Sequence, residues 1–128
     1  MAQILRPHHM GIQVADLERS VAFYRDVLGL EAHPAEVADG ATIVSIPFGD
    51  SEVELLEPRV QDSPIAKFLE RNPSGGIHHV AFATDDVQAQ LGQAAGAGVR
   101  LLHEKPFDGA GGKLVAFLHP KSTFGVLT

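Results

Sequence analysis

The chain has 128 residues, of which 45% are hydrophobic and 20% are charged, and a formal net charge of −6 at pH 7. This length suits one domain spanning residues 1–128, and this composition excludes a disordered chain. The excess of negative charge argues against nucleic acid and membranes as partners, and the absence of cysteine excludes disulfides and thiolate metal ligands.

The first half of the chain predicts the element order β-α-β-β-β. A short alternating strand opens with His8-His9, and Asp16 is placed to cap a following helix, where a carboxylate accepts free backbone N–H groups. Two strands are expected over residues 41–47 and 52–57. The helix should bury an apolar face with i, i+4, i+7 spacing, formed by Leu17, Val21, Tyr24 and Leu28.

The second half repeats this order after a connector. In the connector, Ser63 followed by Pro64 predicts a short helix. The doublet His78-His79 then opens a second alternating strand, and Asp85 or Asp86 is placed to cap a second helix. Further strands are expected over residues 100–103 and 114–118 and near Gly125.

This internal repeat predicts the architecture. We expect an α+β fold of two βαβββ modules, about residues 5–58 and 77–128, joined by a connector over about 59–76. The modules should be related by pseudo-twofold symmetry and form a curled mixed sheet around a metal site. The alternative is a generic α+β sandwich in which the repeat arose by chance, and the matching doublets, aspartates and helix faces argue against it.

Alternation along each opening strand decides which histidine faces the cavity, because successive side chains point to opposite faces. A face of small residues leaves open volume, so we expect His9 and His79 to face the cavity. The bulky faces, with His8 and His78, should pack under helices. In the first strand the two faces are His9, Gly11 and Gln13 against His8, Met10, Ile12 and Val14.

Two imidazoles that converge in a cavity without cysteine predict a divalent metal held by nitrogen and oxygen ligands. Glu54, in the middle of the strand 52–57, is the candidate oxygen ligand beside His9 and His79. Two buried, hydrogen-bonded histidines and a solvated edge carboxylate are the alternatives. The symmetric strand at residues 125–128 has no carboxylate, so we expect either that the natural C-terminus is missing or that the site is incomplete.

The doubled His-His pattern resembles the vicinal oxygen chelate superfamily, the fold of glyoxalases, ring-cleaving dioxygenases and fosfomycin-resistance enzymes. Within it, the likeness to the methylmalonyl-CoA epimerases spans almost the whole chain. The segments around Ser63 and Lys121 are more specific to that branch than the histidines are. The segments that carry the likeness are residues 8–12, 23–29, 53–58, 62–69, 75–81 and 111–123.

The resemblance implies metal ligation by His9, His79, Glu54 and a glutamate that would follow directly after Thr128. It suggests Co²⁺ or Mn²⁺, with Zn²⁺, Ni²⁺ or Mg²⁺ as other candidates, a homodimer, and a place in propionate metabolism. The implied reaction interconverts (R)- and (S)-methylmalonyl-CoA by removal of the α-proton through a metal-stabilised enolate. Glu54 is the candidate catalytic residue, and the glutamate base that some epimerases carry on the second strand has no counterpart in residues 41–45.

The acyl-CoA substrate needs positive or N–H-rich groups. Lys121, Ser122 and Thr123 are candidates to bind its carboxylate or thioester surroundings, and Gly112 with Lys113 is a candidate to bind its phosphates. A solvated surface at Lys121 and a plain hairpin turn at Gly112 are equally open.

The sequence leaves alternative functions open and gives an expectation for the cellular location. A glyoxalase I-like isomerase, a metal-dependent dioxygenase and a non-catalytic small-molecule-binding module of the same fold stay open as alternatives. We expect His33, His103 and His119 to be surface or strand-end residues. The chain has no apolar run near the ~18 residues of a membrane span and no signal-peptide pattern at its start, which predicts a cytoplasmic protein.

Overall fold

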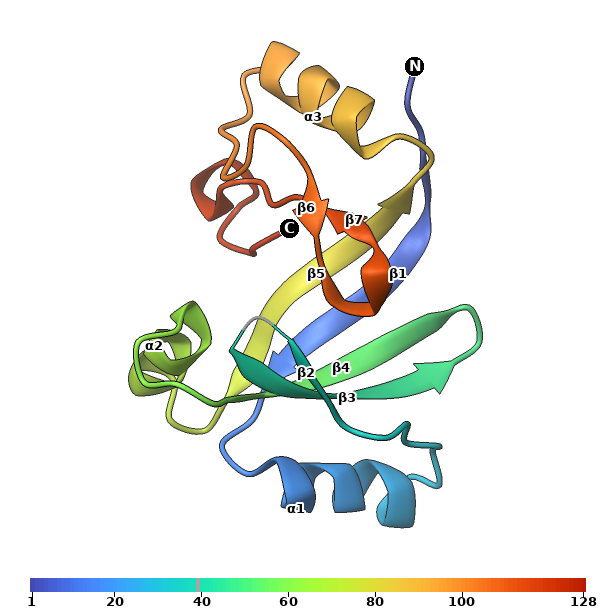
Figure 1. Cartoon of the computed structure of the whole chain (residues 1–128), viewed down its shortest axis with the longest axis vertical. Coiled ribbons are helices and arrows are strands. Elements are labelled where there is room, and N and C mark those ends of the chain that lie inside the picture. The colour runs from blue at the N-terminus through green and yellow to red at the C-terminus, as the bar shows by residue number, and fades with distance from the viewer. Residues whose placement is uncertain (39) are drawn as a thin grey trace. The chain divides into compact units, whose positions relative to one another are not determined.

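The computed structural model describes residues 1–38 and 40–128. These residues form two compact units. Residues His8–His78 make one, which we call the central unit, and residues Met1–Pro7 with His79–Thr128 make the other, which we call the terminal unit. Each unit combines helix and strand (Figure 1), so the chain is α+β as predicted.

The sheet of the central unit is built around β4 (Ser51–Pro58). It pairs in parallel with β1 (Ile4–Gln13) and antiparallel with β3 (Ala41–Phe48), and β2 (Glu36–Ala38) pairs with β3. The order is therefore β2-β3-β4-β1, a mixed sheet with β4 inside it (Figure 1). Both strands predicted between residues 41 and 57 are confirmed, and each is slightly longer than expected.

One face of this sheet packs on the helix α1 (Leu17–Ala22). Asp16 caps it as predicted, since its carboxylate accepts a hydrogen bond from the Arg19 amide at 3.0 Å. The carboxylate of Glu57, at the end of β4, accepts from the Leu17 amide at 2.6 Å and so ties the helix to the sheet. The core between them consists of Leu17, Val44, Ile46 and Leu55.

The buried face of the first helix departs from the prediction at Leu28. After α1 the chain forms a π-helical turn over Phe23–Val27, closed by a hydrogen bond from the Leu28 amide to the Phe23 carbonyl. A π turn holds one residue more than an α turn, so the side chains beyond it rotate by about 100° from the α-helical register. Leu28 is consequently 52% exposed, and Leu30 packs against the core instead.

The connector contains the predicted helix, α2 (Pro64–Arg71). The Ser63 hydroxyl accepts a hydrogen bond from the Ala66 amide at 3.1 Å, and Pro64 occupies the first turn. Phe68 of this helix meets the ring of His78 edge to face, with ring centroids 5.4 Å apart. His78 therefore packs under a helix, as its bulky strand face predicts.

The terminal unit pairs the start of the chain with the second module. β5 (Gly76–Thr84) enters this unit at His79 and leads to α3 (Val87–Gly96), whose N-cap is Asp86. Asp85 has another role: its carboxylate accepts a hydrogen bond from the Gln3 amide at 3.0 Å, and its own amide donates to the Gln3 carbonyl at 3.3 Å.

The remaining strands of the terminal unit are shorter than predicted. β7 (Leu114–Val115) pairs antiparallel with β6 (Phe107–Asp108), which the sequence analysis did not predict. The predicted strand 100–103 is reduced to one β-bridge from Leu101 to Leu118, and the strand near Gly125 is reduced to one parallel bridge from Leu127 to His79.

The strand 100–103 is short because two backbone amides beside its bridge donate to side chains. The Phe117 amide donates to the Nδ1 atom of His103 at 3.1 Å, and the Arg100 amide donates to the Ser122 hydroxyl at 2.9 Å. An amide that donates to a side chain cannot extend a ladder of paired strands. His103 thus has a structural role at a strand end, as expected.

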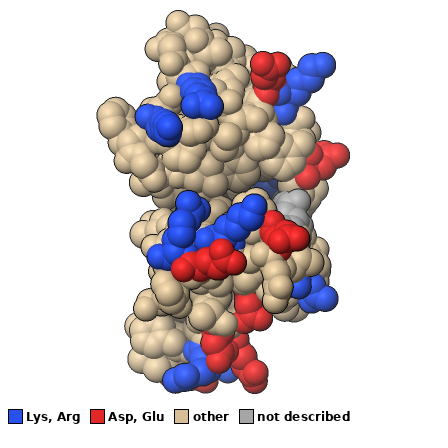
Figure 2. Space-filling view, turned by 90° about the vertical axis from the view of Figure 1, so that its left-hand side faces the viewer, with Lys and Arg blue, Asp and Glu red and all other residues tan. Residues whose placement is uncertain are grey.

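The helices and the surface charge complete the description. Among the described residues, none of the helices combines the length and apolar character needed to cross a bilayer. On the face shown in Figure 2, both positive and negative side chains are present.

Candidate metal centre

The second face of the central sheet carries the predicted polar residues. In the parallel register of β1 and β4, His9 pairs with Glu52, Gly11 with Glu54, and Gln13 with Leu56. Side chains alternate along each strand, so residues paired in this way share a face. Gly11 and Gln13 are buried, whereas Ile12 of the opposite face packs against the core beneath α1. The assignment of faces along the first strand is confirmed from Gly11 onward.

His9 and Glu54 meet on this face. The Nε2 atom of His9 lies 3.6 Å from the Oε1 atom of Glu54, and the two side chains are 14% and 12% exposed. A metal ion bound at ~2.0–2.2 Å by each of two ligands holds the ligand atoms roughly 3–3.6 Å apart. The two residues therefore fit one divalent ion. Because β4 pairs with β3 and β1 on its two sides, Glu54 is not a solvated edge carboxylate.

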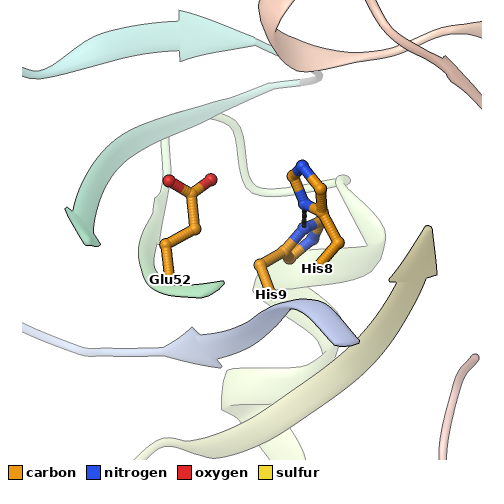
Figure 3. A group of neighbouring side chains, drawn as sticks. All are labelled: His8, His9 and Glu52. Carbon is orange, nitrogen blue, oxygen red and sulfur yellow. Dashed lines mark hydrogen bonds between the residues drawn. The ribbon is translucent and has the colours of Figure 1, made fainter. Parts of the chain in front are cut away.

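His8 differs from the prediction that it packs under a helix. Its Nδ1 atom forms a hydrogen bond of 2.8 Å with the Nδ1 atom of His9, and the two rings meet edge to face at 5.0 Å. Neighbouring Met10, on the same strand face, is 37% exposed. Figure 3 shows the two rings from β1 joined by this hydrogen bond, with the Glu52 carboxylate of β4 nearby.

His79, the predicted partner of His9, lies in the terminal unit. It is 8% exposed, its ring meets the Phe117 ring edge to face at 5.8 Å, and it forms a parallel β-bridge with Leu127. It is thus the more buried histidine of its doublet. Its position facing a cavity and its role as a metal ligand stay predictions. Burial lowers the pKa of its neighbour His78 below the ordinary value of 6.5.

Gln13 carries a polar group that the sequence analysis did not single out. The residue is fully buried, and among the described residues neither its Oε1 nor its Nε2 atom has a hydrogen-bond partner. An unpaired buried amide costs about 1–3 kcal/mol. The sequence did indicate this residue, because Gln13 follows Gly11 on the strand face that was predicted to line a cavity.

The comparisons with known proteins agree with this geometry. Residues 8–117 match the family model described as the Glyoxalase/Bleomycin resistance protein/Dioxygenase superfamily. The chain belongs to this superfamily. Its two modules therefore have the vicinal oxygen chelate fold, which confirms the fold class predicted from the repeated doublets.

Named relatives within the superfamily are epimerases. The chain is 44% identical to ethylmalonyl-CoA/methylmalonyl-CoA epimerase of Cereibacter sphaeroides, over 95% of this chain and 93% of the relative. It is 40% identical to human mitochondrial methylmalonyl-CoA epimerase, over 95% of this chain and 70% of the relative. A solved methylmalonyl-CoA epimerase in complex with methylmalonyl-CoA and NH₄⁺ has a TM-score of 0.92 and 38% identity, covering 98% of this chain and 92% of that one.

The predicted substrate-binding residues of this superfamily member lie in two loops of the terminal unit. The Ser122 hydroxyl accepts a hydrogen bond from the Arg100 amide at 2.9 Å, and the Thr123 hydroxyl donates to the carbonyl of Val126. Both hydroxyls thus hold their own loop in shape. Lys121 next to them is exposed.

The second loop is a glycine-rich turn. The Gly109 amide donates to the Lys113 carbonyl at 2.8 Å, which closes the turn, and Gly112 has a φ of 72°. The turn joins β6 to β7, so it is the hairpin turn that the sequence analysis kept open. Lys113 is exposed, and phosphate binding by this turn stays a prediction.

Proposed function

We propose that this protein is a metal-dependent epimerase that interconverts (R)- and (S)-methylmalonyl-CoA. The observation that carries the proposal is the 44% identity, over 95% of the chain, to an ethylmalonyl-CoA/methylmalonyl-CoA epimerase. The pair of His9 and Glu54, whose side chains are 14% and 12% exposed, adds a donor set that fits a divalent ion.

The chemistry required is the removal and return of a weakly acidic proton next to a thioester carbonyl. His9 and Glu54, with His79 as the third protein ligand, would hold a divalent ion, and that ion would supply a Lewis acid for the negative charge that develops on the thioester oxygen. The family resemblance suggests Co²⁺ or Mn²⁺, and nitrogen and carboxylate ligands are also compatible with Zn²⁺, Ni²⁺ and Mg²⁺.

The residues of this chain divide the remaining tasks. His9 offers one neutral nitrogen to the ion. Glu54 offers an oxygen, and its carboxylate is also the candidate to take the α-proton, because it is held on the same face as His9. Lys121 and Lys113 are exposed charges suited to the substrate carboxylate and the CoA phosphates. Ser122 and Thr123 hold the loop that carries Lys121 in place, and Gly112 shapes the turn that carries Lys113.

The proposal is tested by hydrogen exchange at the α-carbon. Metal-free protein is loaded separately with Co²⁺, Mn²⁺ or Mg²⁺, and methylmalonyl-CoA is incubated with it in D₂O. We expect deuterium at the α-carbon and conversion of either epimer to the mixture, both abolished by a chelator. Ethylmalonyl-CoA tests the width of the substrate pocket, and the glutathione hemithioacetal of a glyoxalase serves as the negative control. Turnover of the hemithioacetal alone would refute the epimerase assignment.

Two further properties belong to this proposal. We expect a homodimer, which size-exclusion chromatography with light scattering tests directly. We also expect the enzyme to act in the cytoplasm and in propionate metabolism, where growth on propionate after deletion of its gene is the measurement.

A further inference from the structure

The hydrogen bond between His8 and His9 has a chemical consequence for the metal site. It joins two Nδ1 atoms at 2.8 Å. A neutral imidazole carries one N–H donor and one lone-pair acceptor, so one ring must donate and the other must accept. Which ring donates decides the tautomer of His9, and hence whether its other nitrogen has a free lone pair.

The position of Glu54 indicates the direction. The Nε2 atom of His9 faces Oε1 of Glu54 at 3.6 Å, the place where an ion held by both would lie. To bind an ion there, Nε2 must be unprotonated, which puts the proton of neutral His9 on Nδ1. Metal-binding histidines ordinarily donate that second N–H to an acceptor, which fixes both the tautomer and the plane of the ring.

We propose that His8 is a positioning residue: its Nδ1 atom accepts the Nδ1–H of His9 and so holds His9 in the tautomer that presents Nε2 toward Glu54. This inference rests on the proposed metal-dependent function. The edge-to-face packing of the rings, with centroids 5.0 Å apart and planes at 81°, adds a restraint on the orientation of His9. Alternation along the strand would turn His8 away from the site, yet its ring fixes the tautomer and orientation of the ligand His9.

The same atoms permit one competing arrangement. His8, His9 and Glu52 place one ligand atom each within 4.8 Å of one another, so they could hold an ion of their own (Figure 3). An ion bound by both Nδ1 atoms would need both lone pairs and would leave no proton on His9 Nδ1. The two arrangements therefore require opposite states of one atom.

The first test reads the tautomer directly in the metal-free protein. Long-range ¹H–¹⁵N spectra of histidine-labelled protein, recorded at about pH 8 so that free imidazoles are neutral, distinguish Nδ1–H from Nε2–H. We expect His9 to be Nδ1–H in the wild type and a mixture of both tautomers in His8→Phe, which keeps a ring but has no acceptor. His8→Asn, which restores an acceptor oxygen, should return His9 toward Nδ1–H. A wild-type His9 in the Nε2–H form would overturn the proposal.

The second test measures Co²⁺ affinity by calorimetry. Loss of such a supporting partner typically weakens metal binding about 10–100-fold, so we expect that loss in His8→Phe and recovery in His8→Asn. Glu52→Gln is the matched control and should bind like the wild type. Binding of two ions per chain, with one lost in both His8→Phe and Glu52→Gln, would support the competing site and overturn the proposal.

These measurements separate the inference from the function on which it rests. A wild-type protein that binds no Co²⁺ would refute the metal-dependent function, while the tautomer of His9 in the metal-free protein would still show whether His8 accepts its proton. A protein that binds Co²⁺ equally well with and without His8 would refute the positioning role alone. Thermal unfolding of each variant shows whether its fold is intact.

Discussion

The Nε2 atom of His9 lies 3.6 Å from the Oε1 atom of Glu54, although the two residues belong to strands separated in the chain by a helix and two other strands. The parallel pairing of β1 with β4 brings them together. Their separation suits two ligands of one ion.

Substitutions at Glu54 distinguish a ligand from a base. Glu54→Gln keeps an oxygen that can bind metal but removes the group that accepts a proton, whereas Glu54→Leu removes both. We expect Glu54→Leu to lower Co²⁺ affinity at least ~10-fold and Glu54→Gln to lower it less. If Glu54 is the base, Glu54→Gln should still lose α-proton exchange by ~10²-fold or more. Exchange that survives in Glu54→Gln would show that Glu54 serves only as a ligand.

Gln13 offers a test of what its buried amide is for. Replacement by leucine removes an unpaired polar group at similar volume, so we expect the free energy of unfolding to rise by about 1–3 kcal/mol. Chemical denaturation measures this change. If stability rises and the KM for the acyl-CoA rises as well, the amide hydrogen-bonds the substrate, and the cost of burying it is offset only in the complex. Unchanged stability would show that the amide carries no burial cost in the free protein.

Gly75 packs closely against the backbone of Gln13. A Cβ atom at Gly75 would overlap the Gln13 carbonyl oxygen, and the φ of Gly75 is +80°. Gly75→Ala should therefore destabilise the protein by about 1–3 kcal/mol. The matched control is Gly92→Ala within α3, where a Cβ atom would meet nothing within 4 Å; there we expect stabilisation by about 0.5–1 kcal/mol. Equal melting temperatures for the two variants would contradict the close approach at Gly75.

The pH dependence of stability should contain a contribution from His78, whose pKa burial lowers below 6.5. Below that pH the unfolded chain binds a proton at His78 that the folded chain does not. Stability must therefore fall as the pH drops from 6.5 through the depressed pKa, and the contribution is constant above and below this interval. In the presence of a chelator, the loss of melting temperature between about pH 7.5 and about pH 5.5 should be smaller in His78→Phe, because this variant lacks the imidazole that binds the proton. An identical loss in both proteins would rule out this role.

We propose a further oxygen ligand at the position directly after Thr128, which the family resemblance implies. Leu127 pairs with His79 across a parallel bridge, so a residue that follows Thr128 would continue a strand segment beside that histidine. We expect a chain extended by one glutamate to bind Co²⁺ at least ~10-fold more tightly than the 128-residue chain. An extension by glutamine or alanine is the control. Equal affinity of all three chains would show that no ligand is needed there.

Much of the fold could be predicted from local pattern. The caps at Asp16 and Ser63 are determined by interactions within a few residues and are found where the sequence places them, and Asp86 is one of the two candidates for the third cap. Alternation, a property of the extended backbone itself, predicted the face of His79 but could not exclude a solvated Glu54. The burial of Glu54 depends on the pairing of β4 with strands on both sides. The repeat of the His-His doublet then indicated a family fold that the comparisons confirm.

The tertiary structure decided what local pattern cannot encode. The extra residue of the π turn moved Leu28 to the surface and Leu30 into the core. The amides of Phe117 and Arg100 donate to the side chains of His103 and Ser122 instead of to a neighbouring strand. The pairing of His8 with His9 depends on how two neighbouring rings rotate about their side-chain bonds. Alternation fixes the direction in which a side chain leaves the backbone, but only the space left by packed neighbours selects where its end comes to lie.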